Sequence, residues 1–258
     1  MKNKEIYYYE NELEDDFATM DNIEIVNVDE NYKYIHKNPI WNLMSIVVQN
    51  VLSMPIKFLY AKLKFNIKFI GKEKLKKSKN NGYFIYANHT QPFADTFIPS
   101  LANYPKRNFF IVDPANISMP GLKLLVRLLG AYPLPSNLKA YKNFLTAIKK
   151  TIEKKHSITI YPEAHIWPYY TKIRNFKSVS FKYPVELNTD VFCITNTYHK
   201  KKNGKIQIIS YIDGPFKVNP KLSKKEAQEE LRNMVYNKMV ERSLNSDYEN
   251  IIYKKKSI

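Results

Sequence analysis

The sequence predicts an α/β fold with a mainly parallel central sheet that is covered by helices on both faces. Short apolar runs, typical of buried strands, recur along the chain. Segments with helical spacing separate these runs, and alternating strands and helices favour a parallel sheet. The 258 residues are enough to bury a sizeable core.

Residues 1–38 form an acidic leader. They carry ten acids and four lysines, so the overall charge of +17 leaves +23 on the rest of the chain. We expect a solvated, partly ordered tail, with a leader folded back on the basic body as the alternative. The basic body favours anionic partners such as phospholipid surfaces, acyl carriers or phosphorylated substrates. Nucleic acid is an unlikely partner on this sequence, which has no recognised nucleic-acid-binding motif.

Residues 39–63 predict an amphipathic helix that contacts a membrane. Asn42, Ser45, Gln49 and Ser53 recur at three- and four-residue spacing, with apolar side chains around the rest of the helix. The polar positions and Pro55 make it a poor spanning segment, so we expect it to lie in the membrane interface. A helix packed on the protein's own core is the alternative. Eight lysines between positions 62 and 79 would lie near anionic headgroups.

Residues 64–258 are expected to form one domain of alternating elements. Strands are predicted at 65–70, 83–87, 109–112, 158–161, 191–195 and 206–212. Helices are predicted at 95–101, 122–129, 138–154, 184–187 and 222–244. The single Cys193 cannot form an internal disulfide, which fits a reducing compartment. No charged start leads into an apolar run, so no secretory signal is expected.

A candidate catalytic pair follows the strand at 83–87. His89 comes just after this strand, and Asp95 opens the next helix. An imidazole titrates near neutrality, and a carboxylate on its other nitrogen fixes the tautomer, so the pair suits general-base chemistry. The carboxyl ends of strands in open α/β sheets are also where ligands bind. The alternative is a loop histidine followed by an aspartate that caps the helix.

Four landmarks, in this order, resemble the lysophosphatidic acid acyltransferase family of the glycerolipid acyltransferases. They are Asn88-His89 with Asp95, Pro120-Gly121 with the run 128–133, Tyr161-Pro162-Glu163, and Phe176-Lys177, all within residues 64–215. The resemblance implies that residues 64–258 are an acyltransferase domain. In it, His89, oriented by Asp95, would deprotonate an acceptor hydroxyl, which attacks the thioester of acyl-CoA or acyl carrier protein. The implied acceptor is a lysophospholipid, such as 1-acylglycerol-3-phosphate.

The resemblance also implies no cofactor, no metal, and a peripheral or monotopic location on the cytoplasmic face of a membrane. Consistent with that, the sequence has neither close metal-ligand pairs nor a nucleophile elbow. The substrate-binding candidates are Asn88 and Glu163, from the matching motifs, and His165, which could instead form a structural hydrogen bond. Lys172, Arg174 and Lys177 are the nearest cations able to replace the family arginines that are absent here, with a solvated basic face as the alternative. Of these, Arg174 is the strongest candidate for a phosphate because its planar fork binds bidentately. Glu163 is expected either to bind the acceptor or to brace the site.

Two departures from the family pattern bear on the acceptor and the pair. Five residues separate His89 from Asp95 where the family has four, and the arginines that bind the acceptor phosphate in the family are missing. A sugar, an amine or a non-phosphorylated lipid is therefore an alternative acceptor. The alternative from another class is a non-catalytic basic protein that binds membranes or nucleic acid.

Overall fold

The structure is a computed structural model that describes residues 4–18 and 23–256. Its strands are β1 (Glu5–Tyr9), β2 (Lys68–Ile70), β3 (Tyr83–Ala87), β4 (Asn108–Val112), β5 (Ala131–Pro133), β6 (Ser157–Ile160), β7 (Val191–Lys200), β8 (Ile206–Phe216) and β9 (Ile251–Lys255). The α-helices are α1 (Pro39–Val47), α2 (Ser53–Phe65), α3 (Ala94–Asn103), α4 (Lys123–Leu128), α5 (Leu138–Glu153), α6 (Lys182–Leu187) and α7 (Lys224–Ser243). A π-helical segment, η1 (Val48–Leu52), joins α1 to α2, and η2 (Lys72–Ser78), η3 (Pro114–Ile117) and η4 (Val179–Phe181) are 3-10 turns.

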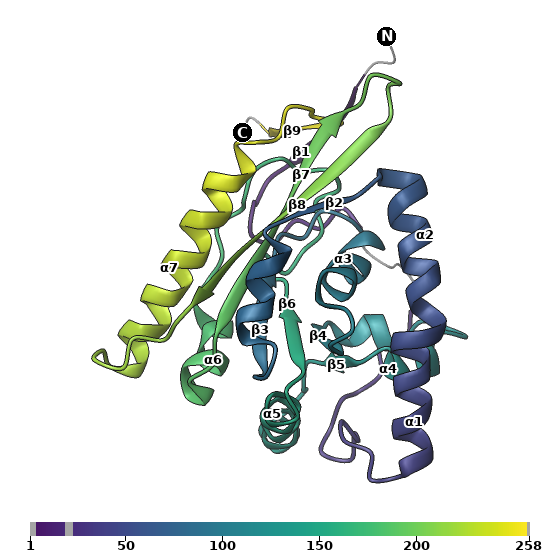
Figure 1. Ribbon diagram of the computed structural model, residues 1–258, viewed down its shortest axis with the longest axis vertical. Helices are drawn as coiled ribbons and strands as arrows, with labels where there is room; N and C mark the ends of the chain where they lie inside the picture. The colour runs from purple at the N-terminus through teal and green to yellow at the C-terminus, as the bar shows by residue number, and fades with distance from the viewer. Residues whose placement is uncertain (1–3, 19–22, 257–258) are drawn as a thin grey trace.

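Seven strands form one mixed sheet in the order β2-β8-β7-β3-β6-β4-β5. Strands β7, β3, β6, β4 and β5 are parallel to one another, whereas β8 runs antiparallel to β7 and carries β2 parallel to itself. Helices lie on both sides of this sheet (Figure 1). The predicted α/β class with a mainly parallel sheet is confirmed.

Each predicted strand and helix overlaps an observed one, but three strands were not predicted. Strand β5 has only three residues, too few to show a periodicity. Strands β1 and β9 pair with each other in parallel, Glu5 opposite Ile251, as a separate two-stranded sheet that joins the two ends of the chain. A pairing across almost the whole sequence leaves no local signal.

The core is divided by the sheet into two apolar layers. On the central strand β3, Phe84 and Tyr86 face the layer covered by α5, α6 and α7. Tyr83 and Ile85 face the layer covered by α2 and α3. Because successive strand residues point to opposite faces, a strand buried on both sides is apolar at every position. This explains why residues 83–87 are apolar without interruption. The polar Asn88 follows directly, where the strand ends.

The helix formed by α1, η1 and α2 turns its polar stripe toward the protein and its apolar side outward. Ser45 donates to the carbonyl of Leu128 at 2.8 Å, and Gln49 donates to the same oxygen at 3.0 Å. Lys57 is also buried, and it bonds to Ser100 at 3.2 Å. Burial lowers the pKa of Lys57 to about 8. The exposed apolar side chains of this helix are Ile40, Leu43, Met44, Ile46, Val51, Leu52, Ile56, Phe58, Leu59 and Leu63.

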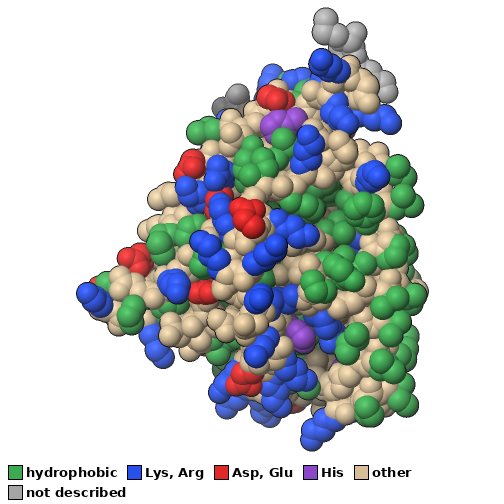
Figure 2. All heavy atoms as spheres, viewed as in Figure 1, with side chains coloured by type: hydrophobic (Ala, Val, Ile, Leu, Met, Phe, Trp, Pro, Cys, Tyr) green, Lys and Arg blue, Asp and Glu red, His purple; other side chains and the backbone are tan. Residues whose placement is uncertain are grey.

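Residues 39–65 are long and apolar enough to cross a membrane, although only a small share of the segment is buried in the protein. Its outer surface forms the green strip along the right edge of Figure 2. We call this strip, made of the ten side chains just named, the apolar face. The expected amphipathic helix is therefore present. Its polar side contacts the rest of the protein, and its apolar side faces outward.

The expectation that the acidic leader is a solvated tail is wrong for its described residues. Val28 is almost fully buried in the core, and the hydroxyl of Tyr34 donates to the carbonyl of Pro133 at 2.9 Å. Phe17 packs edge-on against Trp167, with ring centroids 5.3 Å apart. The apolar and aromatic residues of the leader are scattered between the acids with no clear period, so its composition favoured disorder. In the structure these residues pack against the rest of the protein.

Asp213 on β8 ties three elements together. Its carboxylate is buried and accepts from Lys74 of η2 and from Arg242 of α7, the latter at 2.8 and 2.9 Å. Burial by itself would raise the pKa of Asp213, but the hydrogen bonds and charges of Arg242 and Lys74 outweigh it and lower the pKa.

Asp213→Asn is expected to lower the free energy of unfolding by about 1.5–3 kcal/mol at neutral pH, because charge-assisted bonds are lost. An acid whose folded pKa is depressed stabilises the fold above its unfolded pKa and loses that contribution as the pH falls. The gap between wild type and variant should therefore close below about pH 4. Urea unfolding at several pH values measures it, and a gap that stays constant down to pH 2.5 would rule out the ionised carboxylate as its source.

Candidate active site

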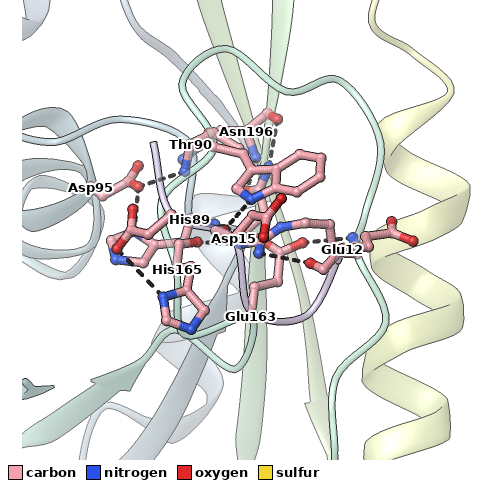
Figure 3. A network of polar contacts seen from close by, with 12 residues as sticks. Glu12, Asp15, His89, Thr90, Asp95, Glu163, His165 and Asn196 are labelled. Atoms are coloured by element: carbon pink, nitrogen blue, oxygen red, sulfur yellow. Dashed lines mark hydrogen bonds and ion pairs between the residues drawn. The ribbon is translucent and has the colours of Figure 1, made fainter. Parts of the chain in front are cut away.

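The loop between β3 and α3 brings His89 and Asp95 into contact. The Nδ1 atom of His89 lies 2.8 Å from Oδ2 of Asp95. The aspartate side chain is fully buried, whereas the imidazole is 18% exposed. With Nδ1 occupied by the carboxylate, Nε2 is the nitrogen left for an external hydroxyl. Figure 3 shows the two side chains next to each other, with Thr90 beside them.

Asp95 is held by the loop that contains its partner. Its Oδ2 also accepts from the backbone N–H groups of Thr90 and Gln91, each at 2.8 Å. Helix α3 begins at Ala94, and its N-terminal cap is Phe93, without a capping side-chain bond. The alternative interpretation of Asp95 as a helix cap is therefore wrong, because its acceptor bonds point back into the loop.

The loop 90–93 accommodates the extra residue between His89 and Asp95. Phe93 at its end is exposed, and the bonds of Asp95 to His89, Thr90 and Gln91 join the two ends of the loop at this spacing. Burial raises the pKa of the Asp95 carboxyl, and the hydrogen bond and charge of His89 oppose this shift. The other carboxylate oxygen, Oδ1, is buried with no hydrogen-bond partner among the described residues.

Tyr161 is a member of this site that the sequence analysis named only as part of the Tyr161-Pro162-Glu163 landmark, without a role of its own. It follows β6, the parallel neighbour of β3, so both strands deliver their next residues to the same edge of the sheet. Its ring stacks on the imidazole of His89 at 4.3 Å between centroids and 22° between planes. Its hydroxyl donates to the backbone carbonyl of Asp95. Tyr161 thus limits rotation of the histidine ring, and its position at the carboxyl end of the strand predicted at 158–161 was the available signal.

Glu163 braces the backbone of the site. This buried carboxylate accepts from the backbone N–H of His89 at 2.9 Å and from that of Arg174 at 2.9 Å. Its Oε2 also lies 3.6 Å from a guanidinium nitrogen of Arg174. Burial raises the pKa of Glu163, and the charge of Arg174 opposes the shift. Of the two roles expected for Glu163, this geometry favours bracing over contact with the acceptor.

Arg174 is buried, contrary to the expectation that it offers a fork to a substrate phosphate. Only 1% of its side chain is exposed. One terminal nitrogen donates to the carbonyl of Glu12 at 3.3 Å, the other to that of His165. The guanidinium lies 5.0 Å from the ring centroid of Trp167. The guanidinium group of Arg174, which was expected to bind an acceptor phosphate, is therefore engaged in interactions within the protein.

The remaining predicted residues fall into two groups. Asn88 is buried, and both polar ends of its amide bond to the backbone of Asn196 on β7, at 2.8 and 3.1 Å, so it fixes the end of β3. Lys172 and Lys177 are exposed, and neither forms an ion pair with any residue in the described part of the chain. Within residues 4–18 and 23–256, no group of three or more His, Cys, Asp or Glu side chains is placed to hold a metal ion.

The acidic leader crosses the outer side of this site, whereas the sequence analysis gave a leader folded back on the body only as the alternative and did not place it here. The carbonyl of Asp15 accepts from the indole nitrogen of Trp167 at 2.7 Å, and Phe17 donates its N–H to the carbonyl of Ile166 at 3.3 Å. The carboxylate of Asp16 lies 3.4 Å from Nδ1 of His165, which is partly exposed. Figure 3 shows the segment with Glu12 and Asp15 lying across the residues around Glu163.

Glu163→Gln is expected to lower the free energy of unfolding by about 3–5 kcal/mol, because it leaves the buried Arg174 charge without its partner. The matched control is Glu153→Gln, which breaks an exposed pair with Lys149 at 3.9 Å and should cost less than about 1 kcal/mol. Chemical denaturation of both variants gives the comparison. Equal losses would show that Glu163 is not a bracing residue.

Two comparisons with known proteins agree with this arrangement. A family model described as acyltransferase matches residues 66–209. The chain is also similar to the crystal structure of the 1-acyl-sn-glycerophosphate (LPA) acyltransferase PlsC from Thermotoga maritima, at 14% sequence identity and a TM-score of 0.52. That match covers 83% of this chain and 87% of the other. At such low identity the likeness shows a shared fold. No curated protein matches the sequence.

The family match covers more than half of the chain and includes β3, the His89–Asp95 loop, Tyr161, Glu163 and Arg174. It therefore spans the whole of the site described above. The resemblance seen in the sequence is confirmed at this level: the chain belongs to the acyltransferase family and is an acyltransferase enzyme.

Proposed function

We propose that this enzyme moves a fatty acyl group from the thioester of acyl-CoA or acyl carrier protein to the hydroxyl of a lysophospholipid, with 1-acylglycerol-3-phosphate as the first candidate. The observation that carries the proposal is the 2.8 Å contact between His89 and a fully buried Asp95 in an acyltransferase domain. Both donors are anionic, and the basic body attracts them. No cofactor is needed beyond the acyl donor itself.

The proposed reaction uses His89 as the general base. Asp95 accepts the Nδ1 hydrogen, which leaves the Nε2 lone pair free for the acceptor hydroxyl. Nε2 takes the hydroxyl proton as the oxygen attacks the thioester carbon, and the buried carboxylate stabilises the resulting imidazolium. Collapse of the tetrahedral intermediate breaks the carbon–sulfur bond. The leaving thiolate then receives the proton from His89, so the products are an ester and a free thiol.

The remaining contacts support this role by holding the ring. Tyr161 stacks on the imidazole, and Glu163 holds the histidine backbone. A base oriented in this way contributes about 10²- to 10⁴-fold to the rate. The rest of the acceleration must come from positioning of the substrates and from electrostatic stabilisation of the intermediate.

The burial of Arg174 favours a second candidate, the same chemistry with an acceptor that lacks a phosphate, such as a sugar, an amine or a neutral lipid. The exposed cations Lys172 and Lys177 are the proposed phosphate contacts if the acceptor is a lysophospholipid, with the partly exposed His165 beside them. Assays with 1-acylglycerol-3-phosphate and with the matching monoacylglycerol separate the two candidates, since the two acceptors differ only in the phosphate.

His89→Ala is expected to reduce thiol release from an acyl thioester, with lysophosphatidic acid as acceptor, by about 10²-fold or more. The matched control is His199→Ala. His199 also has Nδ1 on a carboxylate, that of Asp247 at 2.9 Å, but it lies near the outer end of the β7–β8 hairpin. The control should keep its rate. Unchanged thiol release in a folded His89→Ala variant would reject His89 as the base.

We further propose that the enzyme lies on the cytoplasmic face of a membrane as a peripheral or monotopic protein. The support is the apolar face of the α1–α2 helix, whose polar side is already taken by the protein. Contiguous exposed apolar surface of this kind marks interaction sites. Lysines on and after α2 would meet anionic headgroups.

Replacing Leu43 and Ile56 together with Glu should weaken binding to phospholipid vesicles at least about 100-fold, because each buried aliphatic side chain contributes about 1.5–3 kcal/mol. The control replaces Leu138 and Leu244, which are more exposed than Leu43 and Ile56 but lie outside the apolar face, with Glu. Flotation or sedimentation with vesicles measures the partition. Equal effects of the two double variants would argue against membrane contact through this helix.

A further inference from the structure

A cavity of about 70 Å³ lies at the amino ends of the parallel strands, whereas the His89–Asp95 pair lies at their carboxyl ends. His89 follows the carboxyl end of β3, whereas the cavity is lined by Arg107 and His156, which precede the amino ends of β4 and β6. These three strands are parallel, so the two sites lie at opposite ends of them. The other walls are residues 32–36 of the leader, the start of α1, Arg127 of α4, and the end of α5.

The walls of this cavity carry positive charge and no acid. Its lining cations are Lys33, Arg107, Arg127, Lys150 and Lys154, with the histidines His36 and His156 between them. Among residues 4–18 and 23–256, no aspartate or glutamate lines it. None of the five cations takes part in a salt bridge with the described residues. Figure 2 shows blue side chains gathered around α5, beside the green strip of α1 and α2.

Arg107 is the most deeply placed of these cations, and its protein partners are neutral. Its Nε donates to Gln49 at 2.9 Å, and a terminal nitrogen donates to Ser45 at 2.6 Å. Burial lowers the pKa of Arg107. His156 is affected more strongly: burial, together with the charges of Arg107, Lys106 and Lys154, lowers its pKa to about 4. A guanidinium that is partly removed from water without a counter-ion is costly, so Arg107 favours an anion in the cavity, and the exposed Lys33, Lys150 and Lys154 add positive charge around it.

We propose that this cavity binds a phosphate group. Two arginines and three lysines line it, and planar guanidinium forks match phosphate oxygens while lysines add point charges. Arg127 also packs on aromatic walls, with its Cζ 5.2 Å from the ring centroid of Tyr32 and 5.3 Å from that of Trp41. Its position is therefore fixed before a ligand arrives. The site depends neither on the His89 chemistry nor on the identity of the acceptor.

The phosphate has two possible sources, a lipid headgroup or free phosphate, and the surroundings favour the lipid. Trp41 forms part of the cavity wall, and its neighbours Ile40, Leu43 and Met44 are exposed at this end of the apolar face. Leu124 and Leu125 of α4 are exposed next to Arg127 in the sequence. A phospholipid whose phosphate entered the cavity would have apolar side chains nearby for its acyl chains. It would hold the enzyme on the membrane at the edge far from the catalytic pair.

The test compares two double variants of α5 that remove the same charge. Lys150→Gln with Lys154→Gln removes two cavity cations, and Lys142→Gln with Lys149→Gln removes two exposed lysines of the same helix outside the cavity. Each full-length protein is titrated with inorganic phosphate at constant ionic strength, following the change in tryptophan fluorescence, to which Trp41 in the cavity wall contributes. Each is also sedimented with phosphatidylcholine vesicles with and without 20% phosphatidic acid. Thermal unfolding without ligand checks that all variants fold.

The cavity variant is expected to bind about tenfold more weakly than wild type, while the control stays close to wild type. If this difference is seen with inorganic phosphate, the ligand is a free phosphate. If it is seen only with phosphatidic acid vesicles, the ligand is a lipid headgroup. Equal weakening of both double variants would overturn the proposal, because binding would then follow overall charge. Wild-type protein that binds neither probe saturably would overturn it as well.

Discussion

The buried carboxylate of Asp95 is the constraint on which the site depends. One of its oxygens accepts the imidazole of His89 and two backbone N–H groups of the loop between them, so the aspartate shapes the loop that presents its own partner. Such a closed set of bonds tolerates an additional loop residue, because the residue can move outward without displacing either end. The relative position of His89 and Asp95 is therefore set by these hydrogen bonds more than by the number of residues between them.

Around this pair, the residues that look most suited to bind substrate are engaged in bracing. Glu163 and Arg174 form a buried pair that fastens the segment after β6 to the backbone of His89. The acidic leader then covers the outer side of that segment through Trp167 and Arg174. Charge in this region thus holds the backbone of the His89 loop in place, and Glu163 and Arg174 are already engaged inside the protein.

Polar side chains also bind within the protein in the helix made of α1, η1 and α2. Its polar stripe bonds to Leu128 and Arg107 in the body, which leaves apolar side chains on the outside. If the outer side of this helix faced water, the stable orientation would place its apolar side against the protein, since apolar area would then be removed from water. The observed orientation is stable where the outer side meets an apolar medium. The His89–Asp95 pair and the basic cavity lie at opposite ends of the parallel strands, in one body that carries this helix.

The sequence by itself determined the α/β class, the buried strand before His89 and the pairing of that histidine with Asp95. These features are local: a run apolar at every position reports burial on both faces, and a histidine and an aspartate six residues apart are joined by one short loop. Only the tertiary structure decided that Arg174 is buried, that Tyr161 stacks on His89, that the leader packs on the body, and that five cations surround one cavity. Those contacts join residues from separate elements, in some cases more than a hundred positions apart, and the physical chemistry of a side chain there is set by neighbours that no local pattern reveals.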